Sequence, residues 1–199
     1  SGGAFAPLVV AGKAQPFAAL DWTREESGAY RLTKQAKGLE VRLGELLTGL
    51  AADQICTALE EAYASDYIVE VDGSACAGGN SIESRPWTFT VGDGFFAQPG
   101  GSLTRTFTLA PDLLPMGIAT AKGPWTEGER DLVRVTVLAA SAAEAQAWAL
   151  GLATLDQVRA FELATHAQVA AYAIAWQGGR FLDRDTPAMA QRLRPAAQP

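Results

Sequence analysis

Apolar and polar residues alternate along several short stretches of the chain, the pattern of a strand with one buried face. It predicts strands over residues 39–43, 67–71, 87–91, 103–109 and 132–138. A shorter stretch, 116–120, predicts one more strand, and 169–176 predicts a last one. A polar turn between Trp22 and Tyr30 predicts a small hairpin near the start of the chain.

Elsewhere the apolar residues recur every three or four positions, which is the period of a helix. The clearest such stretch covers residues 46–64, with Asp53, Gln54, Glu60 and Glu61 mainly on the opposite side. A second helix is predicted over 141–154, where Ser141 and Glu144 have the spacing of a capping box. A third is predicted from a cap at Asp156 to about residue 165.

Helices and strands are mixed without a regular strand–helix–strand alternation, which favours an α+β fold. We expect an antiparallel sheet with helices packed on it. Residues 1–182 are interpreted as a single domain. Residues 183–199 hold three prolines and few large apolar side chains, so they are interpreted as a C-terminal tail.

The composition narrows the range of functions. Of the 199 residues, 48% are apolar and 19% are charged, an ordinary balance for a globular domain. The net charge is −6 and the sequence has no run of lysine or arginine, which argues against a nucleic-acid partner. No apolar run is long enough to span a bilayer. The sequence fixes neither the compartment nor the oligomeric state.

The only two cysteines and the only histidine suggest no metal site. Cys56 falls in a helical pattern and Cys76 just after a strand. We interpret them as two separate buried thiols, with a disulfide between them as the alternative. His166 is interpreted as a surface residue in the last turn of a helix.

Five stretches, in order, resemble the motifs of one known protein family. Residues 1–9 resemble S-G-G-A-F-D-P-T-V, and residues 39–53 resemble L-D-L-G-G-I-A-K-G-Y-A-V-D. Residues 67–73 and the following Arg85-Pro86-Trp87 resemble Y-L-V-x-x-G-G-[DE] and R-P-W. Residues 117–120 resemble A-L-A-T, and 133–155 resemble S-V-T-V-[IL]-A-x-S-x-x-E-A-D-A-L-A-T-A-L. Over residues 1–176 the chain is similar to the FAD:protein FMN transferases, the ApbE family, although the family's N-terminal part has no counterpart.

The resemblance implies phosphoryl transfer. In the family, a threonine or serine hydroxyl of a target flavoprotein attacks the FAD phosphate nearest the riboflavin, FMN becomes covalently attached, and AMP leaves. A divalent metal, usually Mg²⁺, neutralises the charge that develops on the diphosphate. FAD is therefore the implied cofactor and a flavoprotein the implied partner. Family members are often exported to the bacterial periplasm.

The matched motif positions define the candidate cofactor-binding residues: Gly44, Gly49, Asp53, Gly73 and Thr120. Glycines let backbone N–H groups approach a phosphate closely. Other readings stay open for four of them. Gly44 also suits a plain turn, Gly49 a helix–sheet contact, Asp53 a solvent-facing helix position, and Gly73 an ordinary Asp-Gly turn. We expect the four residues other than Asp53 to line one concavity.

Several other family positions are changed. Glu45 replaces a glycine, Thr48 a lysine and Ser74 an acidic residue, while Gln146 replaces the metal-holding aspartate and Leu150 a threonine. The family's S-H-I-I-D-P-[RK]-T-G segment has no counterpart. A glutamine brings no charge, so the site is expected to bind Mg²⁺ poorly. We therefore expect weak or no transferase activity, and leave open a non-catalytic flavin-binding or interaction protein; no catalytic residue is assigned.

Overall fold

The computed structural model describes residues 8–10, 13–14, 19–41, 43–81, 84–92, 103–123 and 131–194. It divides into two compact units, Ser1–Glu45 and Leu46–Pro199. Each unit is described by itself. Within the described residues, no helix is both long enough and apolar enough to cross a membrane.

The N-terminal unit consists of short strands. Strand β1 (Leu8–Val10) pairs with β2 (Lys13–Ala14) and with β5 (Glu40–Val41). A separate hairpin joins β3 (Leu20–Arg24) to β4 (Tyr30–Lys34), which confirms the hairpin predicted around Trp22 and Tyr30. The strand predicted over 39–43 is only two residues long in the described part of the chain.

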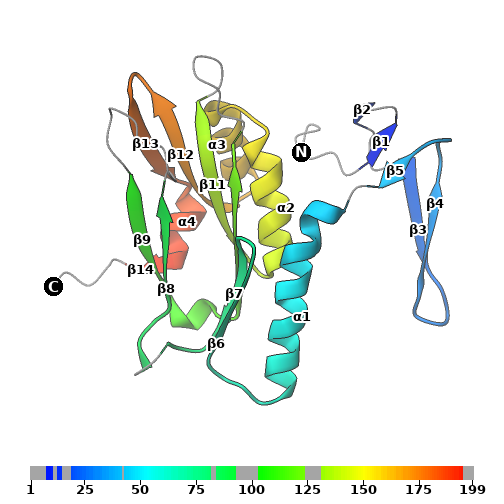
Figure 1. Ribbon diagram of the computed structural model, residues 1–199, viewed down its shortest axis with the longest axis horizontal. Helices are drawn as coiled ribbons and strands as arrows, with labels where there is room; N and C mark the ends of the chain where they lie inside the picture. Colours follow the sequence, from blue (N-terminus) through cyan, green and yellow to red (C-terminus); the bar gives the residue numbers. More distant parts are fainter. Residues whose placement is uncertain are drawn as a thin grey trace. The chain divides into compact units, whose positions relative to one another are not determined.

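The second unit is built on a six-stranded antiparallel sheet with the order β13-β12-β11-β10-β7-β6 (Figure 1). Its strands are β6 (Tyr67–Val71), β7 (Ser74–Gly78), β10 (Met116–Lys122), β11 (Leu132–Ala139), β12 (Ala170–Gln177) and β13 (Arg180–Asp185). A smaller sheet contains β8 (Thr88–Gly92), β9 (Thr104–Leu109) and β14 (Leu193–Arg194). The predicted α+β class, with helices on an antiparallel sheet, is confirmed.

The described residues of this unit also form the α-helices α1 (Leu47–Glu61), α2 (Ala142–Ala153), α3 (Gln157–His166) and α4 (Pro187–Arg192). The predicted caps of two of them are confirmed. The Ser141 hydroxyl accepts a hydrogen bond from the Glu144 N–H at 3.1 Å, and the Asp156 carboxylate accepts one from the Arg159 N–H at 3.0 Å. These bonds satisfy backbone donors that the first turn of a helix leaves free.

Each face of the large sheet carries its own apolar core. On one face, Ala119 and Ala121 of β10 pack with alanines of α2 and α3. On the other, Ile118 of β10 packs with Phe107 of β9 and Met189 of α4. Because successive strand residues point to opposite faces, odd-numbered residues of β10 face α2 and even-numbered ones face the smaller sheet.

Two segments of this unit form strands or a helix that the sequence pattern did not predict. Residues 74–78 form the strand β7 although their small side chains have low strand propensity, because they pair with β6 on one side and β10 on the other. Residues 183–194 are not a tail. They complete β13, form α4 and add β14 to the smaller sheet, and they bury Met189 completely.

The large apolar residues of α1 do not form its buried face. Leu47, Leu50 and Ile55 are 45% to 60% exposed, whereas Gly49, Ala52 and Cys56 are buried. Helix α1 contacts α2, β6 and β7. Small residues let two backbones approach closely, which the leucine side would prevent. The spacing of apolar residues thus indicated a helix correctly but indicated the wrong face.

The two cysteines are also not separate thiols. Cys56 of α1 and Cys76 of β7 form a disulfide, with their Cα atoms 6.6 Å apart. The alternative that the sequence left open is therefore the one found. The bond ties the middle of α1 to the middle of a central strand.

Candidate functional site

The changed family position Gln146 lies where α2 meets the first turn of α1. Its carboxamide oxygen accepts a hydrogen bond from the Gly49 backbone N–H at 2.8 Å. Its amide nitrogen donates to the Thr48 hydroxyl at 2.6 Å. The first N–H groups of a helix have no partner within the helix, so Gln146 serves as a cap provided by a distant segment. Both polar atoms of its side chain are thereby engaged.

Gly49 has no room for a side chain, because α2 packs against it. A Cβ atom added there would lie 2.7 Å from the Gln146 oxygen and 2.8 Å from both the Ala142 carbonyl oxygen and the Ala143 Cα. The absence of a side chain therefore permits the close contact between α1 and α2. The contact alternative for Gly49 is correct, except that its partner is a helix and not the sheet.

The half-buried carboxylate of Asp53 contacts the N-terminus of α2 with both oxygens. One carboxylate oxygen accepts a hydrogen bond from the Ala142 N–H at 2.7 Å, and the other accepts one from the Ala143 N–H at 2.9 Å. A carboxylate at a helix N-terminus also interacts favourably with the helix dipole. This matched motif position thus holds α2 against α1.

Hydroxyl groups continue this cluster toward the sheet. The Thr48 hydroxyl lies 3.4 Å from the hydroxyl of Ser74, the first residue of β7. Ser74 is 1% exposed. The helix-side cluster, which we define as Thr48, Gly49, Ser74 and Gln146, is therefore polar, partly buried and without charge.

Gly73 and Thr120 are neighbours, as the sequence predicted. The Thr120 N–H donates to the Gly73 carbonyl at 3.1 Å. Gly73 has φ +81°, a left-handed conformation that glycine adopts without strain, and it forms the β6–β7 turn with Asp72 at φ +44°. The turn reading of Asp-Gly is therefore correct, and the turn lies beside Thr120.

The Thr120 hydroxyl lies 2.8 Å from that of Thr136, its partner on β11. As an even-numbered residue of β10, Thr120 points to the face of the smaller sheet, whereas Ser74 contacts α1 on the helix face. The helix-side cluster and this threonine pair are thus on opposite faces of the large sheet. Gly49 on α1 and the Thr120 hydroxyl are therefore separated by the sheet, so the two do not line one concavity.

Gly44 belongs to the N-terminal unit, so its part in a binding site stays a prediction. Within the described parts of the chain, no three His, Cys, Asp or Glu residues gather in a way that could hold a metal ion. The donors around Gln146 are hydroxyl and amide groups, which bring no negative charge to a hard divalent cation.

The sequence pattern did not predict that three residues form a hydrogen-bonded contact. Thr48, Ser74 and Gln146 were noted only as losses from the family motifs, yet they contact one another. The sequence did carry one signal. Three charged positions of the family motifs, a lysine and two acids, are all occupied here by neutral residues that can hydrogen-bond to one another. Thr136, buried beside Thr120, gave no sequence signal.

Comparisons with known proteins point to one group. The chain is 26% identical over 188 residues to the FAD:protein FMN transferase of Haemophilus influenzae, which covers 85% of this chain and 52% of that protein. It is 29% identical over 165 residues to the protein of the same name from Escherichia coli K12, covering 75% of this chain and 46% of that protein. The chain thus spans about half the length of these curated relatives. No protein-family model matches it.

Solved structures give the same result for the fold. The apo flavinyl transferase ApbE of Pseudomonas stutzeri superposes with a TM-score of 0.71 at 21% identity, covering 86% of this chain and 58% of that one. The flavin transferase ApbE of Vibrio cholerae superposes with a TM-score of 0.72 at 20% identity, covering 89% and 59%. At these identities the likeness establishes the fold.

Proposed function

We propose that this chain, which is ApbE-like in sequence and in fold, binds a flavin nucleotide but transfers FMN to proteins only weakly or not at all. The observation that carries the second half of the proposal is the state of Gln146. Its oxygen is bonded to the Gly49 N–H and its nitrogen to the Thr48 hydroxyl. The position implied to hold the metal thus joins two helices.

Flavin binding is supported by what remains. The relatives named FAD:protein FMN transferase match 75% to 85% of the chain. The matched residues Gly73 and Thr120 are adjacent, joined by the bond from the Thr120 N–H to the Gly73 carbonyl. Hydroxyl and backbone N–H groups are neutral donors that suit a phosphate without any metal. We infer that the nucleotide approaches this turn, with FAD as the cofactor.

The residues at the site do not fit a magnesium ion. Mg²⁺ favours a near-octahedral set of oxygens with one or two carboxylates. The nearest carboxylate on α1, Asp53, has both oxygens engaged by α2 N–H groups. Without a placed metal, phosphoryl transfer loses several kcal/mol of charge stabilisation, which slows the reaction by about a thousandfold or more.

The test of the transfer step mixes the chain with FAD, MgCl₂ and a flavoprotein target that carries an acceptor threonine. Covalent flavin is then read as fluorescence on a denaturing gel. We expect no band above the no-protein control. Gln146→Asp is expected to restore no activity. The variant still has Thr48 where the family motif has a lysine, and Ser74 where the motif has an acidic residue. A clear band from the unaltered chain would show that the metal site lies elsewhere.

A further inference from the structure

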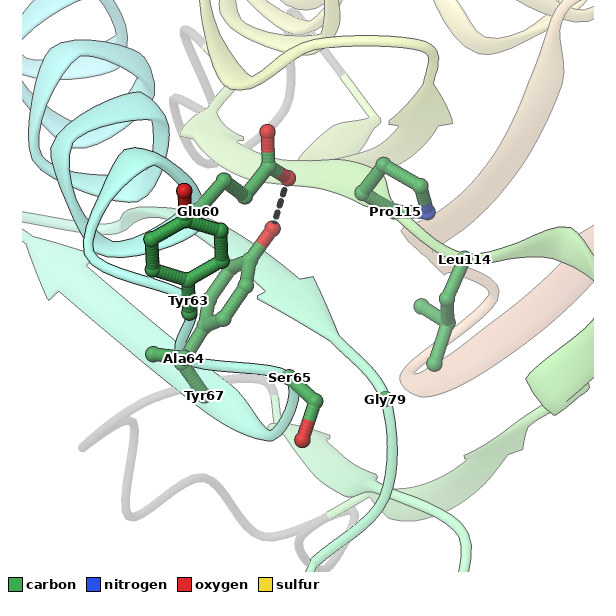
Figure 2. Close-up of a pocket in the computed structure, with 8 residues that line it drawn as sticks. All are labelled: Glu60, Tyr63, Ala64, Ser65, Tyr67, Gly79, Leu114 and Pro115. Carbon is green, nitrogen blue, oxygen red and sulfur yellow. Dashed lines mark hydrogen bonds between the residues drawn. The ribbon is translucent and has the colours of Figure 1, made fainter.

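A cavity of about 480 Å³ opens at the C-terminal end of α1, away from the helix-side cluster. Helix α1 has 15 residues, so its two ends are separated by about 20 Å at 1.5 Å per residue. Glu60, Tyr63 and Tyr67 line one side of the cavity, and Leu114 and Pro115 line the other (Figure 2). Nothing in the proposed flavin chemistry uses these residues.

Tyr63 has an unusual backbone conformation for its type. It is the first residue after the C-cap Ala62 and has φ +62°, in the left-handed region. The Ala64 N–H donates to the Leu59 carbonyl at 2.9 Å. Of the two bonds that end a helix in a Schellman motif, this is the one that spans five residues. Glycine is the usual residue there, and other residues are strained by about 1 kcal/mol or more.

The tyrosine ring gains no burial in exchange for that strain. The side chain is 96% exposed, although the ring is large and mostly apolar. Tyr63 and Glu60 both line the cavity (Figure 2). A strained residue that holds an aromatic ring in solvent at a cavity points to a ligand for that ring.

The charged residue that lines the cavity is Glu60. Tyr67, whose side chain is buried, donates a hydrogen bond from its hydroxyl to one Glu60 oxygen. The Tyr67 ring lies over Gly78, where any Cβ atom would come within 2.7 Å of it. The donor is therefore held in place, and it orients a carboxylate whose other oxygen is bonded to no other lining side chain in Figure 2.

The surroundings favour a positive ligand. No lysine, arginine or histidine occurs between Arg42 and Arg85, whereas that stretch contains eight aspartates and glutamates. It forms all of α1, β6 and β7. A carboxylate together with an aromatic face is the chemistry that binds an organic cation, and a planar guanidinium both pairs with a carboxylate and stacks on a ring.

We propose that this cavity is a binding site for a guanidinium group, held between the carboxylate of Glu60 and the ring of Tyr63, with Leu114 and Pro115 contacting the apolar part of the ligand. Such a group is carried by a free small molecule or by an arginine side chain of a partner protein. The two sources share the same recognition, and the experiment separates them.

The experiment titrates the whole chain with N-acetyl-L-arginine amide and with N-acetyl-L-citrulline amide, its neutral isostere, by NMR or calorimetry. We expect at least tenfold tighter binding of the arginine compound. Agmatine, which carries the guanidinium without a peptide backbone, distinguishes the sources. Equal affinity for agmatine indicates a small-molecule ligand, and much weaker binding indicates an arginine presented by a protein. Equal binding of the arginine and citrulline compounds overturns the proposal.

Two variants with one matched control test the assigned residues. Glu60→Gln is expected to weaken binding at least fivefold, whereas Glu61→Gln, with the same change of charge outside the cavity, changes it less than twofold. Tyr63→Gly is expected to weaken binding at least threefold while raising the melting temperature, because glycine relieves the backbone strain. Opposite effects on folding and on binding exclude a misfolded variant. Equal losses from Glu60→Gln and Glu61→Gln, or unchanged binding by Tyr63→Gly, contradict the site.

Discussion

The side-chain oxygen of Gln146 lies 2.8 Å from the backbone nitrogen of Gly49 and accepts its hydrogen bond. These residues are 97 positions apart and belong to different helices. The bond satisfies a backbone donor in the first turn of α1. It also places a neutral amide where the family resemblance implies a carboxylate for metal. One contact thus accounts both for how α1 meets α2 and for the expected weakness of the chemistry.

Gln146→Ala is expected to lower the free energy of unfolding by about 1–2 kcal/mol, because it leaves the Gly49 N–H without its partner. Chemical denaturation measures the change. Gln54→Ala is the matched control, since Gln54 is an exposed glutamine on α1 and its loss should change stability by less than about 0.5 kcal/mol. Equal effects of the two substitutions would mean that the Gln146 bonds contribute nothing.

Gly49→Ala is expected to destabilise the protein although alanine is the better helix former. The added methyl would meet the Gln146 oxygen at 2.7 Å and the α2 backbone at 2.8 Å. Overpacking of this kind costs about 1–3 kcal/mol, against a propensity gain of about 1 kcal/mol. Gly44→Ala, where a Cβ atom meets nothing within 4 Å, is the control and should be nearly neutral. A gain in stability from Gly49→Ala would show that the two helices are not in close contact.

Reduction of the Cys56–Cys76 disulfide is expected to lower the free energy of unfolding. The two residues are 20 positions apart, and a loop of that length corresponds to about 3 kcal/mol in the chain-entropy description. Thermal or urea unfolding with and without dithiothreitol measures the difference. A Cys56→Ser, Cys76→Ser double variant should be insensitive to the reductant. Identical curves for the unaltered chain in both conditions would show that no such bond forms.

Burial, the hydrogen bond to Glu60 and the charge of that carboxylate raise the pKa of Tyr67 from 10.0 to about 12. A raised pKa in the folded state stabilises the protein below the unfolded pKa, and this contribution is lost as the pH rises from about 10 through about 12. Tyr67→Phe should therefore flatten the fall in stability across that window. In ultraviolet titration of the tyrosines, the ionisation step at about pH 12 should be present in the unaltered chain and absent from Tyr67→Phe. A Tyr67 that ionises near pH 10 would contradict the bond to Glu60.

The α+β class and most strands were predictable because each element has its own apolar period. Strand β11, over Leu132–Ala139, and the capped helix α2 are local features that any segment with that pattern would adopt. The strand β7 was not predictable, since Ser74, Ala75 and Gly78 favour a strand only when neighbouring strands pair on both sides. The helix α4 was missed for a similar reason, because the burial of Met189 depends on β12 and β9 being in place.

The candidate site was predicted less well than the fold. Gly73 and Thr120 are adjacent, because Gly73 is in the turn that leads into β7 and Thr120 is on β10, which pairs with β7. Asp53 and Gly49 are instead used in the contact between α1 and α2, a long-range relation that spacing along one helix does not reveal. Likewise, a period of three to four residues does not tell which side of α1 is covered, and the side with glycine and alanine was the buried one.

The most direct test of the central claim is an equilibrium titration of the chain with FAD, once in MgCl₂ and once in EDTA, followed by flavin fluorescence. We predict saturable binding with the same dissociation constant in both buffers, within about twofold, because the side chains around Gln146 are neutral and both oxygens of Asp53 accept bonds from α2. Binding that requires magnesium would contradict the neutral site, and no binding in either buffer would contradict flavin recognition and leave this fold as an interaction protein.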